Sequence, residues 1–517
     1  MKRSFFASLL ALLLSAGLPV SAQTFTNPLP PRAADCYVAK FGDWYYMVGT
    51  PCPGNWELRW TGIWKSRDMV HWSGPMLAYE GDDRDRPMWA SEIYHHAGAY
   101  FMITTCNTWN AGSTMMLQKA PTPTGPYTLY AHLPKFGLDP GIFTDVDGKA
   151  YLLHSSWVTP LDSTWTKVTG ENRGVSDNTE GQFIIKNGNR YLRFFARIVP
   201  GYPMEYEVAS EPYTAAYEQK GIVYSGVFDP GHGCIAPSPD GTQLWFVSHY
   251  NTSGWPSRRL AMDPVRFGLD GMPEPVVRDT LPQPVPSLHR IGADIAPGKF
   301  VNSAGTLSGN DPLKVIDGDP ATAWRTEEYL EIDLAGEFEV EKVALDFPDR
   351  KKHAWRVLSS VDRCTWKPGH EGFSRFLRIV DCDAPSVSEI HVYPVKRPVP
   401  VWSDRVRVAD TTSFRLSRGS LQEMPLEVPV AGTYDFVCRL RALRGLHNAW
   451  SLYDGDRRLA WETVATTGLE DHVTQVITFG LPLTAGRHAF RLVGEEGEVE
   501  IVGTELILLE EPARPTR

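Results

Sequence analysis

Residues 138–156 read LDPGIFTDVDGKAYLLHSS, two short apolar runs joined by a polar turn. A carboxylate, Asp139, stands in a Gly/Pro corner before the first run, and Asp147-Gly148 precedes the second run, residues 150–153. Apolar runs joined by an Asp-Gly turn are a strong local signal for a β-hairpin. We therefore expect two antiparallel strands here, with an acid at the entrance of the first.

This unit occurs five times in the first half of the chain. The five copies open with Asp35, Glu92, Asp139, Glu180 and His232, and they turn at Gly42-Asp43, Ala97-Gly98, Asp147-Gly148, Asn187-Gly188 and Asp240-Gly241. Successive opening residues are 57, 47, 41 and 52 positions apart. Strand pairs that repeat every roughly 40–50 residues indicate a β-propeller, so five copies predict five blades.

The opening residues are the first candidates for a functional site. In a propeller the innermost strand of each blade lines the central channel, so four acids and one histidine should converge on one axis. Acids before strands are also ordinary turn formers. Turn formation could explain one or two of these residues, but it does not account for such a residue at the same place in all five repeats.

Composition excludes some classes of protein. The 517 residues are 42% hydrophobic and 11% aromatic, which suffices for several packed cores. The 17 Trp suit core packing, and flat rings also suit the apolar faces of sugars. The net charge of −10 argues against nucleic acid as a partner, because nucleic acid selects basic surfaces.

The N-terminus carries an export pattern. Lys2 and Arg3 precede an apolar run over residues 5–14, and Val20-Ser21-Ala22 offers a small-residue cleavage site. We expect residues 1–22 to be a signal peptide, without a lipoprotein cysteine, and the mature protein to be periplasmic or secreted. No later stretch reaches the ~18 apolar residues of a membrane span.

Proline-rich links divide the mature chain. Residues 24–285 hold the repeats, residues 290–395 and 403–511 show short alternating strands between turn residues, and links at 273–286 and 394–402 separate these units. No segment after residue 22 has a convincing helical period. The predicted fold class is all-β: a five-bladed β-propeller followed by two β-sandwich domains.

The seven cysteines lack metal-type spacing. Export permits disulfides, and Cys364 with Cys382, within one small domain, is the first pair to test. Buried free thiols are the expectation for the other five.

Several ordered motifs in residues 24–285 carry a resemblance to glycoside hydrolase family 43. They are Ala34-Asp35 with Tyr45-Tyr46, Ser66-Arg67-Asp68 with Trp72, Trp89-Ala90-Ser91-Glu92, Asp139 to Phe143 with Asp147-Gly148, Glu180-Gly181, and Gly231-His232. Family 43 enzymes are five-bladed propellers that cleave arabinose- and xylose-containing glycans with inversion. The resemblance implies Asp35 as general base, Glu180 as general acid and Asp139 as the carboxylate that orients the acid and raises its pKa.

This chemistry needs more than one carboxyl group. Inverting hydrolysis uses one protonated carboxyl to donate to the leaving oxygen and one carboxylate to activate water, with about 6.5–9.5 Å between them. The resemblance implies that Glu92 is structural, and no metal ligand is assigned.

Three further residues are candidates for substrate binding. Trp89 could stack on a sugar ring. The resemblance implies that His232 contacts the substrate region or a water around an axial ion, and that Arg258 reaches the sugar; a packed histidine and an exposed ion pair are the alternatives. Cys36, Ser91 and Gln182 stand where proline is common in the family, which puts the substrate in doubt more than the activity.

The two C-terminal units also show resemblances. Residues 316–334 resemble a discoidin-type (factor V/VIII C-type) module, and Val430 to Tyr434 with Leu483 to His488 resemble jelly-roll carbohydrate-binding modules. Each unit either binds sugar or is architectural. No cofactor is expected to be required; a structural Ca²⁺ in the propeller axis or in the sandwiches is compatible with the resemblance.

The sequence thus predicts an exported inverting glycoside hydrolase whose partner is an oligo- or polysaccharide. It removes arabinofuranosyl or xylosyl residues, with galactosyl and galactofuranosyl residues as further candidates. The rivals are a non-catalytic glycan-binding propeller, which the loss of an acid would have favoured, and a structural adhesin, which predicts no carboxylate cluster.

Overall fold

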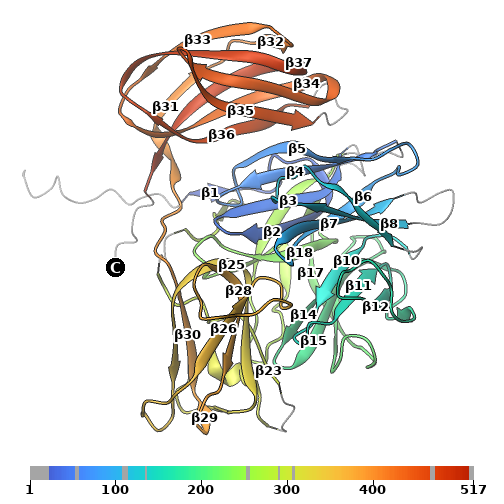
Figure 1. Cartoon of the computed structure of the whole chain (residues 1–517). Helices are drawn as coiled ribbons and strands as arrows, with labels where there is room; N and C mark the ends of the chain where they lie inside the picture. The colour runs from blue at the N-terminus through green and yellow to red at the C-terminus, as the bar shows by residue number, and fades with distance from the viewer. Residues whose placement is uncertain are drawn as a thin grey trace, which may run out of the picture.

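The computed structural model describes residues 23–52, 57–106, 114–133, 137–251, 257–288, 292–304, 309–465 and 472–511. The predicted signal peptide, residues 1–22, lies outside these ranges. Within them the chain is built from strands and includes a short 3₁₀ helix, η2 (Pro312–Val315). No helix in the described ranges is long and apolar enough to cross a membrane. The all-β prediction is therefore confirmed (Figure 1).

Five consecutive sheets in the described part of the chain form the blades of a propeller (Figure 1). The blades are β2–β5 (Ala33–Phe41, Trp44–Pro51, Trp60–Ser66, Trp72–Glu80), β6–β9 (Trp89–His96, Ala99–Cys106, Thr114–Ala120, Thr128–Leu133), β10–β13 (Gly141–Thr144, Ala150–His154, Trp157–Leu161, Arg173–Gly174), β14–β17 (Thr179–Asn187, Arg190–Arg197, Met204–Ala209, Glu218–Gly226) and β18–β20 (Gly233–Pro237, Leu244–Tyr250, Arg259–Val265). The first two strands of each blade are the predicted hairpin, so the five-fold repeat is confirmed.

The start of the chain closes the ring. The backbone N–H of Leu29 donates to Leu260 O (2.8 Å), and the N–H of Leu260 donates to Pro31 O (2.9 Å), so residues 29–31 run beside β20. Asn27 continues this contact, because its side chain donates to Met262 O (3.0 Å). Two short strands, β1 (Thr24–Phe25) and β22 (Gln283–Pro284), pair next to it, and β21 (Val276–Arg278) pairs with β17. Blade five is thus completed by the residues that lead into blade one.

Residues 300–394 form the first sandwich. Its strands are β23 (Phe300–Ser303), β24 (Trp324–Arg325), β25 (Tyr329–Asp346), β26 (Arg356–Ser360), β27 (Lys367–Pro368), β28 (Phe373–Val380), β29 (Ser386–Val387) and β30 (Glu389–Pro394). The long strand β25 pairs with β28 through its first half and with β30 through its second half, so it belongs to both layers. Trp324, Leu330, Ile332 and Leu377 lie in the core between them.

The first sandwich contacts the turn region of every blade. Polar contacts reach Gly42 from Glu337, Ala97 from Asp362, Thr144 from Arg363, Gly188 from Val301 and Gly241 from Lys299. These blade residues lie at or beside the turns between the first and second strands, at the end of the channel away from the opening acids. The first sandwich therefore covers that end of the channel.

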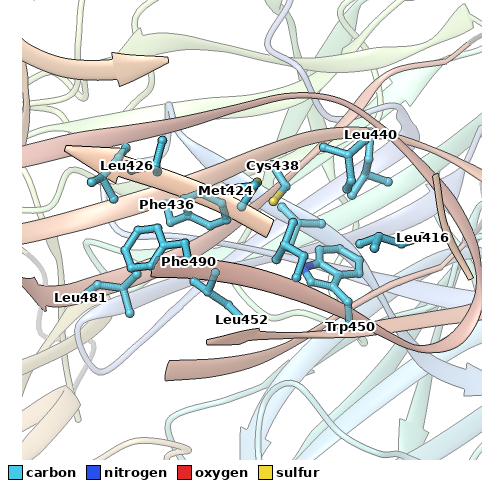
Figure 2. Close-up of a cluster of buried hydrophobic side chains, with 14 of the residues drawn as sticks. Leu416, Met424, Leu426, Phe436, Cys438, Leu440, Trp450, Leu452, Leu481 and Phe490 are labelled. Carbon is cyan, nitrogen blue, oxygen red and sulfur yellow. The ribbon is translucent and has the colours of Figure 1, made fainter. Parts of the chain in front are cut away.

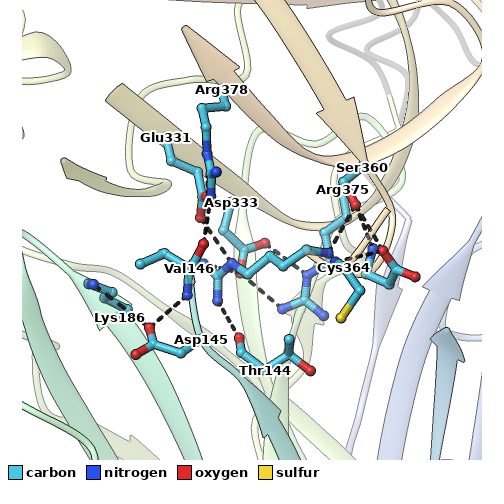
Figure 3. A network of polar contacts seen from close by, with 12 residues as sticks. Thr144, Asp145, Val146, Lys186, Glu331, Asp333, Ser360, Cys364, Arg375 and Arg378 are labelled. Carbon is cyan, nitrogen blue, oxygen red and sulfur yellow. Dashed lines mark hydrogen bonds and ion pairs between the residues drawn. The ribbon is translucent and has the colours of Figure 1, made fainter. Parts of the chain in front are cut away.

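Buried ion pairs hold this interface (Figure 3). Arg363 pairs with Glu331 (2.9 Å) and donates to Thr144 O (3.0 Å), while Arg378 pairs with Glu331 (2.6 Å) and donates to Val146 O (2.8 Å). Glu331 is fully buried, and within the described part of the chain these two arginines are the cations that pair with it. One carboxylate thus fixes two cations against blade three.

Residues 401–510 form the second sandwich. Its strands are β31 (Val401–Asp410), β32 (Phe414–Ser417), β33 (Leu421–Val428), β34 (Gly432–Asp454), β35 (Arg457–Ala465), β36 (Thr474–Leu483) and β37 (Gly486–Glu510). The long strands β34 and β37 pair along most of their length. Figure 2 shows the apolar core that they enclose, with Phe436, Trp450 and Phe490 among its largest members.

The second sandwich is joined to blade one. Gln475 of β36 is paired with Gly74 of β5, and the side chain of Thr474 donates to Gly74 O (2.8 Å). The N–H of Ile477 donates to Ser73 Oγ (2.9 Å), and Arg67 pairs with the buried Asp435. The sheet of blade one therefore continues into the sandwich (Figure 1).

The predicted disulfide is wrong. All seven cysteines are free, and Cys364 lies beyond Ser360 while Cys382 lies beyond Val380. β26 and β28 are antiparallel, with Ser360 opposite Phe376 and Arg356 opposite Val380, so the two thiols leave opposite ends of this ladder. The two cysteines are close in the sequence, but the sequence does not show that the strands before them run in opposite directions. The other five cysteines are buried free thiols, as expected.

Candidate active site

Asp35, Asp139, Glu180 and His232 meet at one end of the channel. The Nδ1 atom of His232 lies 3.4 Å from Asp35 Oδ1 and 3.6 Å from Asp139 Oδ2. One ligand atom each of Asp139, Glu180 and His232 lie within 4.8 Å of one another. Sequence positions up to 197 residues apart are thus brought together by blades one, three, four and five.

A left-handed backbone residue opens each innermost strand. These residues are Asp35 (φ 57°), Ala90 (φ 48°), Asp139 (φ 59°), Gly181 (φ 57°) and His232 (φ 49°). The repeat therefore places Asp35, Asp139 and His232 in phase, Glu180 one residue earlier and Glu92 two residues later. The sequence analysis predicted that all five opening residues occupy equivalent positions in their blades, and for Glu180 and Glu92 this prediction is wrong.

Gly181 is required at its position. A Cβ on Gly181 would lie 2.4 Å from Cγ of His232, and its φ of +57° is costly for other residues. The absent side chain lets the histidine ring pack against the backbone that follows Glu180. The Glu-Gly pair in the sequence is thus explained by this contact.

Asp35 is held by three neighbours. Thr50 Oγ1 donates to its Oδ2 (2.7 Å), and Arg258 Nη1 donates to its Oδ1 (3.3 Å). Its backbone N–H donates to Nδ1 of His249 (3.2 Å), so the proton of this ring is on Nε2. Burial and the charge of Arg258 hold the pKa of His249 well below its usual value, so the ring is neutral. The arrangement suits a carboxylate that accepts a proton from water.

Asp139 is the acid whose pKa the site raises most clearly. Burial raises its pKa well above the usual value, the charges of Glu180 and Asp35 raise it further, and Arg258 opposes them. We had expected the retained proton on Glu180. Burial among these acids instead favours the protonated form of Asp139. The site thus combines a carboxyl group that retains its proton with a carboxylate, Asp35, that is held beside the positive charge of Arg258.

Tyr202, His249 and Thr50 were not found by sequence reasoning. The hydroxyl of Tyr202 donates to Glu180, and its ring stacks on that of His249 with centroids 5.7 Å apart. A Cβ on Gly231 would lie 2.4 Å from the Tyr202 ring, so this glycine makes room for it. The sequence offers one indication of their role: each of these three residues lies near or after the end of the second strand of its blade. A side chain at that position can reach the next blade.

Glu92 lies deeper in the channel. It lines a cavity of about 140 Å³ together with Tyr37 and Tyr94 from the propeller and Arg375 from the first sandwich. The hydroxyl of Tyr94 donates to it, and burial raises its pKa to about 8. Its place below the other acids agrees with the interpretation that it is structural.

Glu92 makes stability depend on pH. Its folded pKa of about 8 exceeds the ordinary value of 4.5, so the folded state binds the extra proton and loses stability as pH rises between these values. One such group lowers the free energy of unfolding by up to about 1.4 kcal/mol per pH unit. We predict that Glu92→Gln flattens the stability curve between pH 5 and about 8, measured by urea unfolding at several pH values; parallel curves for both proteins would contradict this.

Trp89 lies at the mouth of the channel. It packs with Leu58 and Trp60 of blade one and with Leu446 and Ala465 of the second sandwich. Trp89 stands one residue before left-handed Ala90, the position that Glu180 takes before Gly181. The sandwich thus approaches the same mouth as the predicted sugar-stacking residue.

Cys36, Ser91 and Gln182, which stand where proline is common in the family, form hydrogen bonds with other residues of the propeller. Gln182 donates to Trp157 O (2.7 Å) and accepts from Arg193 (2.8 Å), and Ser91 Oγ lies 2.9 Å from Thr104 Oγ1. The thiol of Cys36 donates to Ala33 O (3.5 Å). None replaces one of the three acids.

The clustered acids fit acid–base chemistry better than calcium. Asp139, Glu180 and His232 are the one group of three such ligands found among the described residues. Ca²⁺ takes about six to eight oxygen ligands, whereas this set offers two carboxylates and a nitrogen. These side chains alone do not make a Ca²⁺ site.

Comparison with known families agrees with this geometry. Residues 25–273 match the family model described as glycosyl hydrolases family 43. These residues form a family 43 glycoside hydrolase domain. The five blades and the clustered carboxylates both lie within the family 43 domain. The family assignment drawn from the motifs is therefore confirmed for this part of the chain, whereas the discoidin and carbohydrate-binding-module resemblances stay predictions.

Individual relatives are distant. A xylosidase/arabinosidase of Butyrivibrio fibrisolvens is 25% identical over 187 residues, which cover 32% of this chain and 34% of that protein. The chain thus matches about a third of the length of this curated relative. A thermostable family-43 glycoside hydrolase structure is 23% identical with a TM-score of 0.46, covering 51% of this chain and 99% of that one. An exo-β-1,3-galactanase from Phanerochaete chrysosporium is 13% identical with a TM-score of 0.42, covering 94% of this chain and 100% of that one.

Proposed function

We propose that this protein is an exported inverting glycoside hydrolase. Asp35 is the general base, Glu180 the general acid, and Asp139 the third carboxylate, which orients and tunes the acid. The observation that carries the proposal is the convergence of these three acids on His232 within the family 43 domain. Export rests on the sequence pattern of residues 1–22 alone.

The proposed steps follow from the positions of the side chains. Glu180 donates a proton to the glycosidic oxygen as the bond to the anomeric carbon breaks. Asp35 removes a proton from the water that attacks the opposite face of the sugar. Arg258 and Thr50 fix the carboxylate of Asp35, and Tyr202 fixes that of Glu180.

The substrate we favour is a terminal arabinofuranosyl or xylosyl residue of a plant-type polysaccharide, with galactosyl and galactofuranosyl residues as further candidates. The xylosidase/arabinosidase relative and the galactanase relative are consistent with this range. Trp89, His232 and Arg258 are the proposed sugar contacts. The alternative function, a non-catalytic glycan-binding propeller, is not favoured, because no acid of the set is missing.

Hydrolysis of four aryl glycosides tests the proposal. We expect release of the aryl group from one of the α-L-arabinofuranoside, β-D-xyloside, β-D-galactoside and β-D-galactofuranoside, and no release with Asp35→Asn. Silence of the wild-type protein on all four and on branched oligosaccharides, together with sugar binding, would instead support the non-catalytic alternative.

A further inference from the structure

The corner of the chain that carries Asp139, residues 139–142, is held by blade two. The backbone N–H of Asp139 donates to Thr105 Oγ1 (2.9 Å), and the backbone N–H of Ile142 donates to the hydroxyl of Tyr94 (2.7 Å). Tyr94 lies in β6 and Thr105 in β7, so two side chains of blade two fix the two ends of the corner. Asp139 has a left-handed backbone (φ 59°), which is uncommon outside glycine and persists only where the surroundings hold it.

Tyr94 is itself held by Glu92. Its hydroxyl accepts from the N–H of Ile142 and donates to Oε2 of Glu92, so both functions of the hydroxyl are used. Burial raises the pKa of Tyr94 well above its usual value, so the hydroxyl keeps the proton that it donates. The ring packs between blades two and three, where its centroid lies 5.9 Å from that of Trp165. The place of the hydroxyl is therefore set by the packed ring and by Glu92.

Glu92 also contacts the corner directly. A Cβ on Gly141 would lie 3.0 Å from Oε2 of Glu92 and 3.3 Å from its Oε1, so the carboxyl group packs against the backbone two residues after Asp139. The pairing of β6 with β7 is irregular between Trp89 and Glu92. Glu92 therefore lies beside Gly141 of the next blade, and it supports the corner from below.

The contacts of Asp139 with the other site residues depend on where this corner lies. Its Oδ2 atom is 3.6 Å from Nδ1 of His232, and one ligand atom each of Asp139, Glu180 and His232 lie within 4.8 Å of one another. Charges at such short range act strongly on each other's protonation. A displacement of Asp139 by about 1 Å would therefore disturb the acid, and displacements of this size can cost about 10²-fold in rate.

We propose that Glu92 and Tyr94 are positioning residues that hold Asp139, through the corner 139–142, where it orients Glu180. Both residues act through Asp139 and not on the sugar. The inference rests on the proposed function, because Glu180 needs this orientation only as the acid of the hydrolysis. It gives blade two, which supplies none of the three proposed catalytic acids, a part in the reaction.

The rates of two full-length variants test the positioning role. Glu92→Leu removes the acceptor of the Tyr94 hydroxyl, and Tyr94→Phe removes the link to Ile142 but keeps the packed ring. We expect each variant to lower kcat and kcat/KM by about 10²-fold, with KM unchanged, on the aryl glycoside that the wild-type protein cleaves. The double variant should be no slower than the slower single variant, because both changes break the same link.

Two further variants separate positioning from a general loss of stability. Glu92→Gln keeps an acceptor for the Tyr94 hydroxyl, so it should recover most of the rate that Glu92→Leu loses. Tyr127→Phe is the matched control, because the buried Tyr127 precedes β9, the outermost strand of blade two, and its hydroxyl donates to Pro123 O (3.0 Å). This variant also breaks a bond between a tyrosine and the backbone, but it should leave kcat unchanged.

An unchanged kcat in Tyr94→Phe, or a rate in Glu92→Gln as low as that in Glu92→Leu, would overturn the positioning role and leave the proposed hydrolase in place. A wild-type protein that cleaves no glycoside would overturn the proposed hydrolase. Crystal structures of the wild-type and Tyr94→Phe proteins would then decide the positioning role without turnover. Asp139 should lie farther from His232 in the variant; the same position in both structures would contradict the inference.

Discussion

Glu180→Gln should lower kcat by about 10²–10⁴-fold, the usual contribution of a positioned acid or base. The amide keeps the shape of the side chain and can still accept the Tyr202 hydroxyl, but it cannot donate a proton to the leaving oxygen. Binding should persist, because His232, Arg258 and Asp35 remain in place. Rates on the aryl glycoside that the wild-type protein cleaves, with calorimetry on the matching oligosaccharide, measure both effects.

A second glutamate in the same blade provides a control that separates a loss of catalysis from a loss of folding. Glu218 opens β17 in the same blade, and its side chain is 76% exposed. Glu218→Gln should leave rate and binding unchanged. An undiminished rate in Glu180→Gln would remove Glu180 from the role of acid and point to Asp139, whose pKa is raised by burial and by Glu180.

Arg363→Ala should destabilise the folded protein by about 3–5 kcal/mol, the usual cost of breaking a buried ion pair. Arg363 is 4% exposed and its partner Glu331 is fully buried. The substitution leaves part of the charge of Glu331 uncompensated and removes the donor to Thr144 O of blade three (Figure 3). Urea unfolding followed by tryptophan fluorescence measures the change.

An exposed pair in the same sandwich is the control. Arg356 and Asp381 have side chains that are 67% and 59% exposed, so Arg356→Ala should cost at most about 1 kcal/mol. If Arg363→Ala were as mild as Arg356→Ala, the first sandwich would not be a structural closure of the channel. The buried pair that joins this sandwich to blade three would then contribute little to stability.

The local features of the propeller could be predicted from sequence. Turns such as Asp147-Gly148 and Asn187-Gly188 are specified by their own residues, so the five hairpins follow directly from the repeat. The phase of the acids could not be predicted, because it depends on a backbone bulge. Glu92 comes two residues after left-handed Ala90, and strand geometry moves it about 6–7 Å down the channel.

Contacts between blades and between domains had no sequence signal. Thr50 and His249 hold Asp35 from the ends of the second strands of blades one and five. Alternating hydrophobicity shows that a strand has a buried face, but it does not show which partner covers it. The contact of Glu337 with Gly42, across 295 positions, belongs to this class.

The anomeric configuration of the first sugar released tests the central claim most directly. Asp35 as base and Glu180 as acid predict inversion, so proton NMR of the early reaction should show a product of the opposite anomeric configuration to the glycoside. A product that first appears with the configuration of the substrate would mean that a carboxylate attacks the sugar itself, and would contradict the roles assigned to Asp35 and Glu180.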